Sequence, residues 1–281
     1  MIIDTPAQIN PRCLALGSKY FPIFWLATDP PILVEGGVSA VIPRVLREMK
    51  ELDLALPQVL ILLHEHSDHV LGAPPLRRAL NLEILASKES SQLLAKEKVI
   101  KGYREADRFF THVLKSREEG EEGPWETFPP IHPLEETSLP SGLHILSTPG
   151  HSPGSMALFW EEEGILMASD SLGYYSSRGK HFPLFFQSLE LYLKSIRLMA
   201  QTEPGILVLG HLQCFFDEEA EEIFKRSQEE ALTLAQKVKR AGDMAQEMVY
   251  KAIRQDELVT FYPRETIQEC ARLLVKRSQE A

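Results

Sequence analysis

Short apolar runs alternate with longer amphipathic segments from about residue 20 to residue 215. Short runs rich in β-branched and aliphatic residues are typical of buried strands, whereas apolar positions three or four residues apart predict helices. The runs that predict strands are 32–35, 59–63, 82–86, 144–148, 156–161, 164–168 and 206–209. The segments that predict helices are 38–52, 90–115 and 192–200. This alternation predicts a layered α/β fold.

Two stretches depart from the alternation. Residues 118–142 are rich in Glu, Pro and Gly without periodicity, which predicts a surface loop. After residue 216 the periods are helical, and the segment 217–241 begins with acidic residues and ends with basic ones, which matches the helix dipole. Two further helices are predicted around 244–253 and 267–274, and a short strand is considered at 258–262. Each of these helices has an apolar face to bury.

Composition narrows the class of protein. A chain of 281 residues that is 44% hydrophobic can bury a sizeable core. The formal net charge of −10, without a basic stripe, makes nucleic acid a poor partner. Cys13, Cys214 and Cys270 are too far apart for a disulfide framework or a metal knuckle, which is typical of a reducing compartment. With no signal-peptide pattern and no membrane-length apolar run, we expect a cytoplasmic protein without a membrane partner.

Potential metal ligands follow the run 59–63 within six residues, as His64, His66, Asp68 and His69. Imidazole and carboxylate groups buried at a strand end need partners, and a metal ion is the natural one. Extended geometry places His64 and His66 on the same side, and a turn after them can direct Asp68 and His69 toward a neighbouring point. The cluster therefore predicts a metal site that could hold two ions.

Three more polar residues lie at or just beyond the ends of later apolar runs: His151, Asp170 and His211. His151 is flanked by Pro and Gly, which suit a tight loop close to a site. Ends of strands are where α/β folds place ligands and catalytic groups, so we expect these residues to join the cluster. Ordinary core or surface positions are expected for His112, His132, His144 and His181.

The motifs HxHxDH, PGHSPGS, SD and GH, in this order, closely resemble those of the metallo-β-lactamase superfamily. The resemblance implies an αββα sandwich as the catalytic domain, residues 1–216, with two divalent metal ions at one edge. It implies that His64, His66 and His151 hold one ion, that Asp68, His69 and His211 hold the other, and that Asp170 bridges them. Zinc, iron and manganese all accept such ligands.

Departures from branches of that family narrow the chemistry. His66 stands where the flavodiiron oxidoreductase branch carries Glu, which favours hydrolysis over oxygen reduction. The second ligand set has no cysteine, unlike zinc β-lactamases of the Asp-Cys-His kind. The sequence is therefore more similar to other hydrolases of the superfamily.

Segments outside the ligands resemble the quinolone-signal response type, a 2-aminobenzoylacetyl-coenzyme A thioesterase; they are CLALGSKYFPIFWL, ILVEGGVS, PLFFQSLELYLKSIRL and VTFYPRETIQECARLLVKRS. The resemblance implies that residues 217–281 form a helical cap packed on the active-site edge. Tyr174 stands where that type places a glutamate, and Cys270 stands near the serine that its last helix directs at the site. We expect both to contact substrate, with Phe182 and Phe185 as an apolar wall.

The leading hypothesis is hydrolysis of a thioester or ester by a hydroxide that bridges two metal ions. Asp68 would orient that hydroxide and accept its proton, and Tyr174 could donate to the oxyanion or the leaving group. Phosphodiesterase and lactonase activities use the same chemistry. Two other classes stay open: a non-haem iron oxidoreductase such as a persulfide dioxygenase, and a regulatory binding protein that retains the metal site. The expected partner is a small-molecule substrate, and the sequence is compatible with an oligomer.

Overall fold

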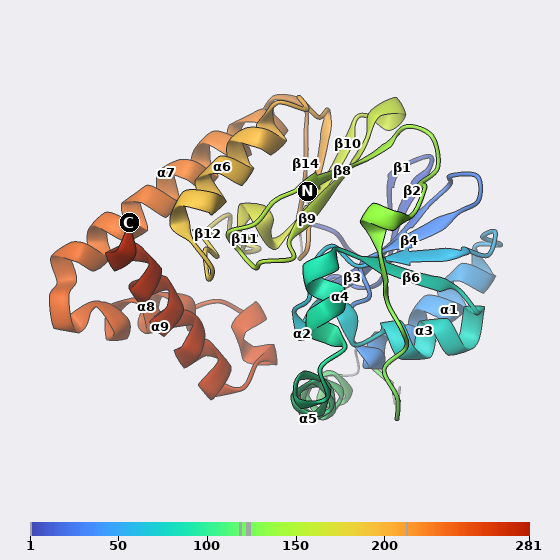
Figure 1. Cartoon of the computed structure of the whole chain (residues 1–281), viewed down its shortest axis with the longest axis horizontal. Coiled ribbons are helices and arrows are strands. Elements are labelled where there is room, and N and C mark those ends of the chain that lie inside the picture. Colours follow the sequence, from blue (N-terminus) through green and yellow to red (C-terminus); the bar gives the residue numbers. More distant parts are fainter. Residues whose placement is uncertain (1, 118–119, 122–124, 212) are drawn as a thin grey trace. The chain divides into compact units, whose positions relative to one another are not determined.

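The computed structural model describes residues 2–117, 120–121, 125–211 and 213–281. The chain divides into two compact units, each built on one larger β-sheet. The N-terminal unit comprises residues within 2–141 together with Gly210 and His211, and the C-terminal unit comprises 142–209 and 213–281. Figure 1 shows the elements of both units along the chain.

The sheet of the N-terminal unit has the strand order β1-β2-β3-β4-β5-β6-β7. Its strands are β1 (Ala7–Asn10), β2 (Cys13–Ser18), β3 (Phe21–Leu26), β4 (Ile32–Val34), β5 (Val59–Ile61), β6 (Glu83–Ala86) and β7 (His132–Pro133). Pairs from β1 to β4 are antiparallel, and pairs from β4 to β7 are parallel. Because β4 and β5 run parallel, their carboxyl ends meet at one edge of the sheet, where the first predicted ligands begin.

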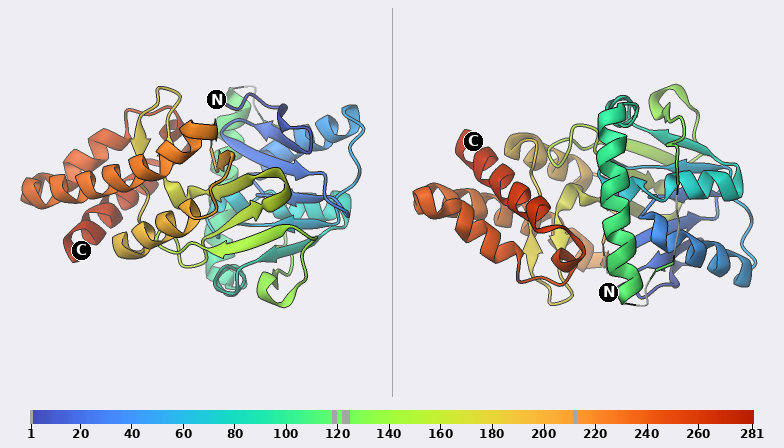
Figure 2. Two further views of the ribbon diagram at one scale, coloured as in Figure 1. Left: turned by 90° about the horizontal axis from the view of Figure 1, so that it is seen from above. Right: turned by 90° about the horizontal axis from the view of Figure 1, so that it is seen from below.

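The helices of this unit are η1 (Ser39–Val41), α1 (Ile42–Glu51), α2 (Ser67–Val70), α3 (Ala73–Leu80), α4 (Lys88–Leu94), α5 (Glu97–Ser116) and η2 (Leu134–Glu136). The prediction of one helix over 90–115 is wrong in one respect, because Lys96 adopts an extended conformation that separates α4 from α5. Ser87 begins α4 by accepting a hydrogen bond from the Ser90 backbone N–H. Figure 2 shows α5 as one continuous helix.

The sheet of the C-terminal unit has the strand order β14-β13-β10-β9-β8. Its strands are β8 (Leu143–Ser147), β9 (Met156–Trp160), β10 (Ile165–Ser169), β13 (Ile206–Leu209) and β14 (Cys214–Phe216), and β11 (Tyr174–Tyr175) pairs with β12 (His181–Phe182). Two 3₁₀ turns, η3 (Glu161–Glu163) and η4 (Asp170–Leu172), follow β9 and β10. Only β10 and β13 form a parallel pair among these described strands.

The helices of the C-terminal unit are α6 (Leu189–Ala200), α7 (Asp217–Ala241), η5 (Gly242–Met244), α8 (Ala245–Ile253), η6 (Leu258–Phe261) and α9 (Arg264–Glu280). The strand considered at 258–262 is wrong, because residues 258–261 form η6 and Tyr262 follows it. Figure 2 shows α6 and α7 side by side. Leu166 and Leu207 of the sheet share one hydrophobic core with Ile223, Phe224 and Leu274 of the helices. The three predicted C-terminal helices are confirmed.

No helix in the described part of the chain combines the length and the apolar character that crossing a bilayer requires. The longest helix, α7, buries one apolar stripe and exposes charged residues along the rest of its surface.

Candidate metal centre

The HxHxDH segment begins three residues after β5 ends and runs into α2. Neighbouring helices hold this loop through Glu65: its carboxylate accepts a hydrogen bond from Ser90 Oγ at 2.8 Å, and its carbonyl accepts one from the Tyr103 hydroxyl. Burial, with the nearby charges of Glu65 and Asp68, raises the pKa of Tyr103 far above its usual range, so this hydroxyl stays a donor. The loop that carries His64 is therefore fixed by α4 and α5.

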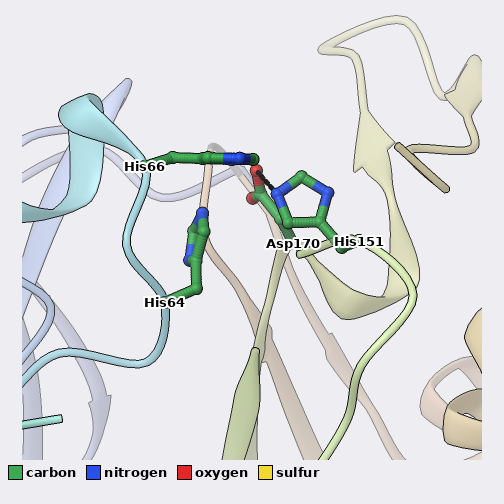
Figure 3. Close-up of side chains that lie close together, drawn as sticks. All are labelled: His64, His66, His151 and Asp170. Carbon is green, nitrogen blue, oxygen red and sulfur yellow. Dashed lines mark ion pairs between the residues drawn. The ribbon is translucent and has the colours of Figure 1, made fainter. Parts of the chain in front are cut away.

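His64 and His66 project from this loop as neighbouring rings, with centroids 4.8 Å apart (Figure 3). His64 is buried and His66 is half-buried. The His64 ring also lies 4.1 Å from the ring of His69, so the first two predicted ligands lie beside the next set.

Asp68, His69 and His211 form a buried cluster whose donor atoms converge. His69 Nε2 lies 3.2 Å from His211 Nε2 and 3.4 Å from Asp68 Oδ2, and His211 Nε2 lies 3.5 Å from the same oxygen. Two imidazole nitrogens and a carboxylate oxygen around one point are a donor set that zinc, iron and manganese accept. The residues present therefore fit a divalent metal ion.

The Nδ1 atoms of His69 and His211 face groups outside this cluster. His211 Nδ1 donates to the carbonyl of Tyr20, and His69 Nδ1 lies 3.2 Å from Glu35 Oε2. A hydrogen bond at Nδ1 leaves Nε2 as the electron-pair donor, and it also fixes the orientation of the ring. This is the arrangement expected of metal-binding histidines.

His151 and Asp170 form a second buried pair, in the C-terminal unit, with His151 Nε2 3.5 Å from Asp170 Oδ2 (Figure 3). The loop between β8 and β9 carries His151, whose Nδ1 donates to the Leu184 carbonyl at 2.8 Å. Gly150 is required before it, because a Cβ there would lie 2.2 Å from the backbone nitrogen of Tyr192 and its φ is 129°. The sequence predicted both residues, and the structure brings them together.

Glu35 is a site residue that the sequence analysis missed. It follows β4 directly, its side chain is buried, and its φ of 67° is unusual for a residue other than glycine. A charged residue at the end of an apolar run was the signal that identified Asp170, and the same criterion would have found Glu35 in the segment ILVEGG.

The predicted substrate-contacting residues all lie in the C-terminal unit. Tyr174 is buried, its hydroxyl donates to Asp256, and its ring stacks with Phe182 at a centroid distance of 6.2 Å. Phe185 is fully buried in the core beside Tyr192, whereas Cys270 is half-buried on α9. Their contact with substrate stays a prediction.

A surface cavity of about 700 Å³ lies elsewhere in the N-terminal unit, at the end of α3. Its lining includes Arg77, Arg78 and Trp125 and contains none of the predicted ligands. A metal site requires donor atoms that converge on one point, which this cavity lacks. The candidate site is therefore the histidine cluster and not the cavity.

Comparison with known proteins agrees with this geometry. The model of the metallo-beta-lactamase superfamily matches residues 24–211. Hydroxyacylglutathione hydrolase GloC of Haemophilus influenzae is 28% identical over 191 residues, which cover 67% of this chain and 83% of that protein. A metallo-beta-lactamase family protein of Thermus thermophilus superimposes with a TM-score of 0.64 at 20% identity, over 95% of this chain and 92% of that one. A di-iron-bound form of the protein TTHA1623 gives a TM-score of 0.52 at 21% identity, over 80% of this chain and 98% of that one.

The family match covers more than half of the chain and includes all seven predicted ligands. It confirms the predicted αββα fold class, to which the two sheets with their helices and the long C-terminal helices correspond. The buried His and Asp clusters are consistent with a binuclear metal site of this fold. The chain therefore belongs to the metallo-β-lactamase superfamily.

Proposed function

We propose that this protein is a metal-dependent hydrolase of a small thioester or ester. The observation that carries the proposal is the convergence of Asp68 Oδ2, His69 Nε2 and His211 Nε2, with the second nitrogen of each ring engaged by another group. The similarity to GloC supports the thioester, because the name of that relative describes hydrolysis of a hydroxyacylglutathione, which is a thioester.

The proposed ligand sets follow the family motifs. His64, His66 and His151 would hold one divalent ion, Asp68, His69 and His211 would hold the second, and Asp170 would bridge them. When bound, such ions lower the pKa of a water molecule toward ~7 and polarise the carbonyl oxygen of the substrate.

The chain's own residues would then orient the reactants. Asp68 would orient the attacking water and accept its proton. The position of its carboxylate, 3.4 Å from His69 Nε2 and 3.5 Å from His211 Nε2, supports this role. The Tyr174 hydroxyl donates a hydrogen bond to Asp256 in this structure, so protonation of a leaving group by Tyr174 requires that hydrogen bond to break. We therefore propose Tyr174 first as part of the pocket wall, together with Phe182.

The helical extension is proposed to shape the same pocket. Arg277 of α9 donates from Nε to the carbonyl of Phe186 at 3.1 Å, and the Phe186 ring lies 5.3 Å from that of His151. These contacts, all within the C-terminal unit, connect α9 to the loop beside a proposed ligand. They support the role of residues 217–281 as a cap, with Cys270 on the same helix.

The experiment is a substrate panel with protein loaded separately with zinc, manganese and iron. Acylglutathione and acyl-coenzyme A thioesters, 2-aminobenzoylacetyl-coenzyme A among them, should be cleaved much faster than a phosphodiester or a lactone. Ellman's reagent detects the released thiol. A protein that binds two metal ions and cleaves none of the esters or thioesters would contradict the proposal.

An iron oxidoreductase is the second candidate, because the histidine and aspartate donors accept iron and one structural neighbour is a di-iron-bound form. Oxygen consumption by the iron-loaded protein with glutathione persulfide would support this alternative. The absence of consumption, together with thioester cleavage by the zinc form, would support the hydrolase.

A further inference from the structure

The cavity at the end of α3 lies between two segments of the N-terminal unit. One is a face of α3, where side chains recur at the three- and four-residue spacing of one side of a helix: Pro74, Arg77, Arg78 and Asn81. The other is the segment 125–130, WETFPP, within the stretch in which the sequence predicted a surface loop. The volume of about 700 Å³ is in the range of sites that bind small organic molecules.

The α3 side of the cavity is positively charged. Arg77 donates from Nη1 to the carbonyl of Leu82 at 3.0 Å, which fixes the guanidinium but uses only one of its five N–H groups. Arg78, the next residue, is exposed and lines the same cavity. The described lining contains one carboxylate, that of Glu126, so cations are in excess here although the chain has a formal net charge of −10. Guanidinium groups are suited to a carboxylate, which they bind through paired hydrogen bonds.

The segment 125–130 contributes two aromatic rings. Trp125 is buried and donates from Nε1 to Asp107 Oδ2 at 2.8 Å, and the Arg104 guanidinium lies 5.6 Å from its ring centroid. The half-buried Phe128 ring lies edge-on to that of Trp125, with centroids 5.6 Å apart. These contacts position the rings before any ligand binds, which reduces the conformational entropy lost on binding.

The two sides of the cavity together select a class of ligand. A phosphate ion would use the arginines and gain nothing from the rings, whereas a neutral hydrocarbon would use the rings and gain nothing from the cations. Anchoring of the loop explains the buried Trp125, but it requires neither the half-buried Phe128 nor the two arginines. A ligand that has a flat apolar ring and an anionic group interacts with both sides.

We propose that this cavity binds a small aromatic carboxylate, with its ring against Trp125 and Phe128 and its carboxylate at Arg77 and Arg78. None of the seven predicted metal ligands lines the cavity, so this is a second site, and it does not depend on the proposed hydrolysis.

The test uses the zinc-loaded full chain, labelled with nitrogen-15, and 2-naphthoate as the probe. The chain has three tryptophans, Trp25, Trp125 and Trp160, and therefore three indole N–H signals, of which Trp125→Phe identifies one. We expect the Trp125 signal to shift in a saturable way as 2-naphthoate is added. The signals of Trp25, which donates to the Ala55 carbonyl, and of Trp160 should stay in place.

The carboxylate subsite is tested by Arg78→Gln, because Arg78 is exposed and its replacement should not affect folding. We expect the dissociation constant of 2-naphthoate to rise about tenfold, as charge-assisted hydrogen bonds are lost. Arg77→Gln should have a similar effect, but it also removes the hydrogen bond to Leu82. Arg108→Gln is the matched control, since Arg108 is exposed on α5 in the same unit and does not line the cavity. It should bind the probe like the wild type.

The aromatic subsite is tested by Phe128→Leu, which keeps an apolar side chain. It should weaken binding of 2-naphthoate and change that of cyclohexanecarboxylate less, because the flat ring of the probe loses its aromatic neighbour. The neutral 2-naphthylmethanol should bind the wild type about ten times more weakly than 2-naphthoate.

An unshifted Trp125 signal, as expected if the carboxylate binds only at zinc, would overturn the proposal. Equal affinity for 2-naphthylmethanol would do the same, because it would indicate an apolar crevice. Displacement of 2-naphthoate by an equal concentration of inorganic phosphate would indicate a simple anion site instead. Unchanged affinity in Arg78→Gln, or an equal loss in Arg108→Gln, would also contradict the proposal.

Discussion

Asp170 begins η4 directly after β10 and lies against His151, and the preceding Ser169 has a φ of 48°. In Asp170→Asn we expect a folded protein that has lost about one metal equivalent and nearly all turnover, because an amide is a poorer bridging ligand than a carboxylate. Metal analysis and thiol release measure the two losses. A variant with full metal content and a normal rate would end the two-metal interpretation.

Asp107 shows how a buried carboxylate outside the site behaves. It accepts hydrogen bonds from the Ser39 N–H at 3.2 Å, from Ser39 Oγ at 2.6 Å and from Trp125 Nε1 at 2.8 Å. Burial nevertheless raises its pKa to about 6, because the three donors do not fully offset desolvation of the charge. Asp107→Asn should keep its metal ions and is therefore the control for Asp170→Asn.

The same shift predicts a pH dependence of stability. Since the folded-state pKa of Asp107 is above the unfolded value, its contribution to stability is fully present below about pH 4 and is lost as pH rises through 6. The loss amounts to about 3 kcal/mol at most. Urea unfolding at pH 4, 5, 6 and 7 should show the stability of Asp107→Asn rising relative to the wild type along this series. A constant difference would show that the pKa of Asp107 is not raised.

At the scale of elements, the hydrogen bond from Tyr174 to Asp256 connects β11 to the segment between α8 and η6. Tyr174→Phe should lower the free energy of unfolding by about 1 to 2 kcal/mol, and a double-mutant cycle with Asp256→Asn should show coupling of similar size. Tyr250→Phe is the control, because the buried Tyr250 hydroxyl has no hydrogen-bond partner among the described residues. Additive effects in the cycle would mean that the contact contributes nothing.

The long helices and the strands β4, β5, β6, β8, β9, β10 and β13 were predicted from their apolar runs, but the other strands, β2 and β3 among them, and α3 were not. Both strands are buried almost throughout, so β3 (Phe21–Leu26) shows no alternation of polar and apolar positions. A short continuous apolar run of this kind gives no period from which a strand can be distinguished. In the η6 segment, Val, Thr, Phe and Tyr favour a strand, and tertiary packing overrides that preference.

The break between α4 and α5 was missed for a different reason. The helical period continues through residues 90–115, and neither Gly nor Pro marks the break at Lys96. Ser90 and Tyr103, which hold Glu65 of the histidine loop, lie on opposite sides of the break. The change of direction allows two helices to contact one loop, which is a requirement of tertiary structure that no local pattern records.

At the scale of the whole molecule, the metal ions are expected to complete the site without being needed for the fold. Each unit has its own buried sheet, so exhaustive chelation should leave the far-ultraviolet circular dichroism largely unchanged and abolish turnover. The melting temperature should fall by a few degrees, because bound metal stabilises the folded state by mass action. Global unfolding on chelation would mean that the metal is chiefly structural.

The motif residues of the site could be predicted because each follows an apolar run and together they match a family pattern. Glu35 and the carbonyls of Tyr20 and Leu184, which orient the rings, were not predicted. They approach the histidines from segments distant in the chain, and a backbone carbonyl has no sequence signature. The sequence thus predicted the candidate donors, and the structure was needed to show which nitrogen of each ring is left to bind a metal ion.

The late position of His211 in the chain determines when the metal-binding cluster can form during synthesis. Residues within 2–141 emerge from the ribosome before His211, which belongs to the same unit but follows β13 in the chain. The cluster with Asp68 and His69 therefore cannot close until about three quarters of the 281 residues have been synthesised. A nascent chain arrested before that point presents an incomplete set of donors, so metal capture by this cluster is deferred until the second sheet has almost been translated.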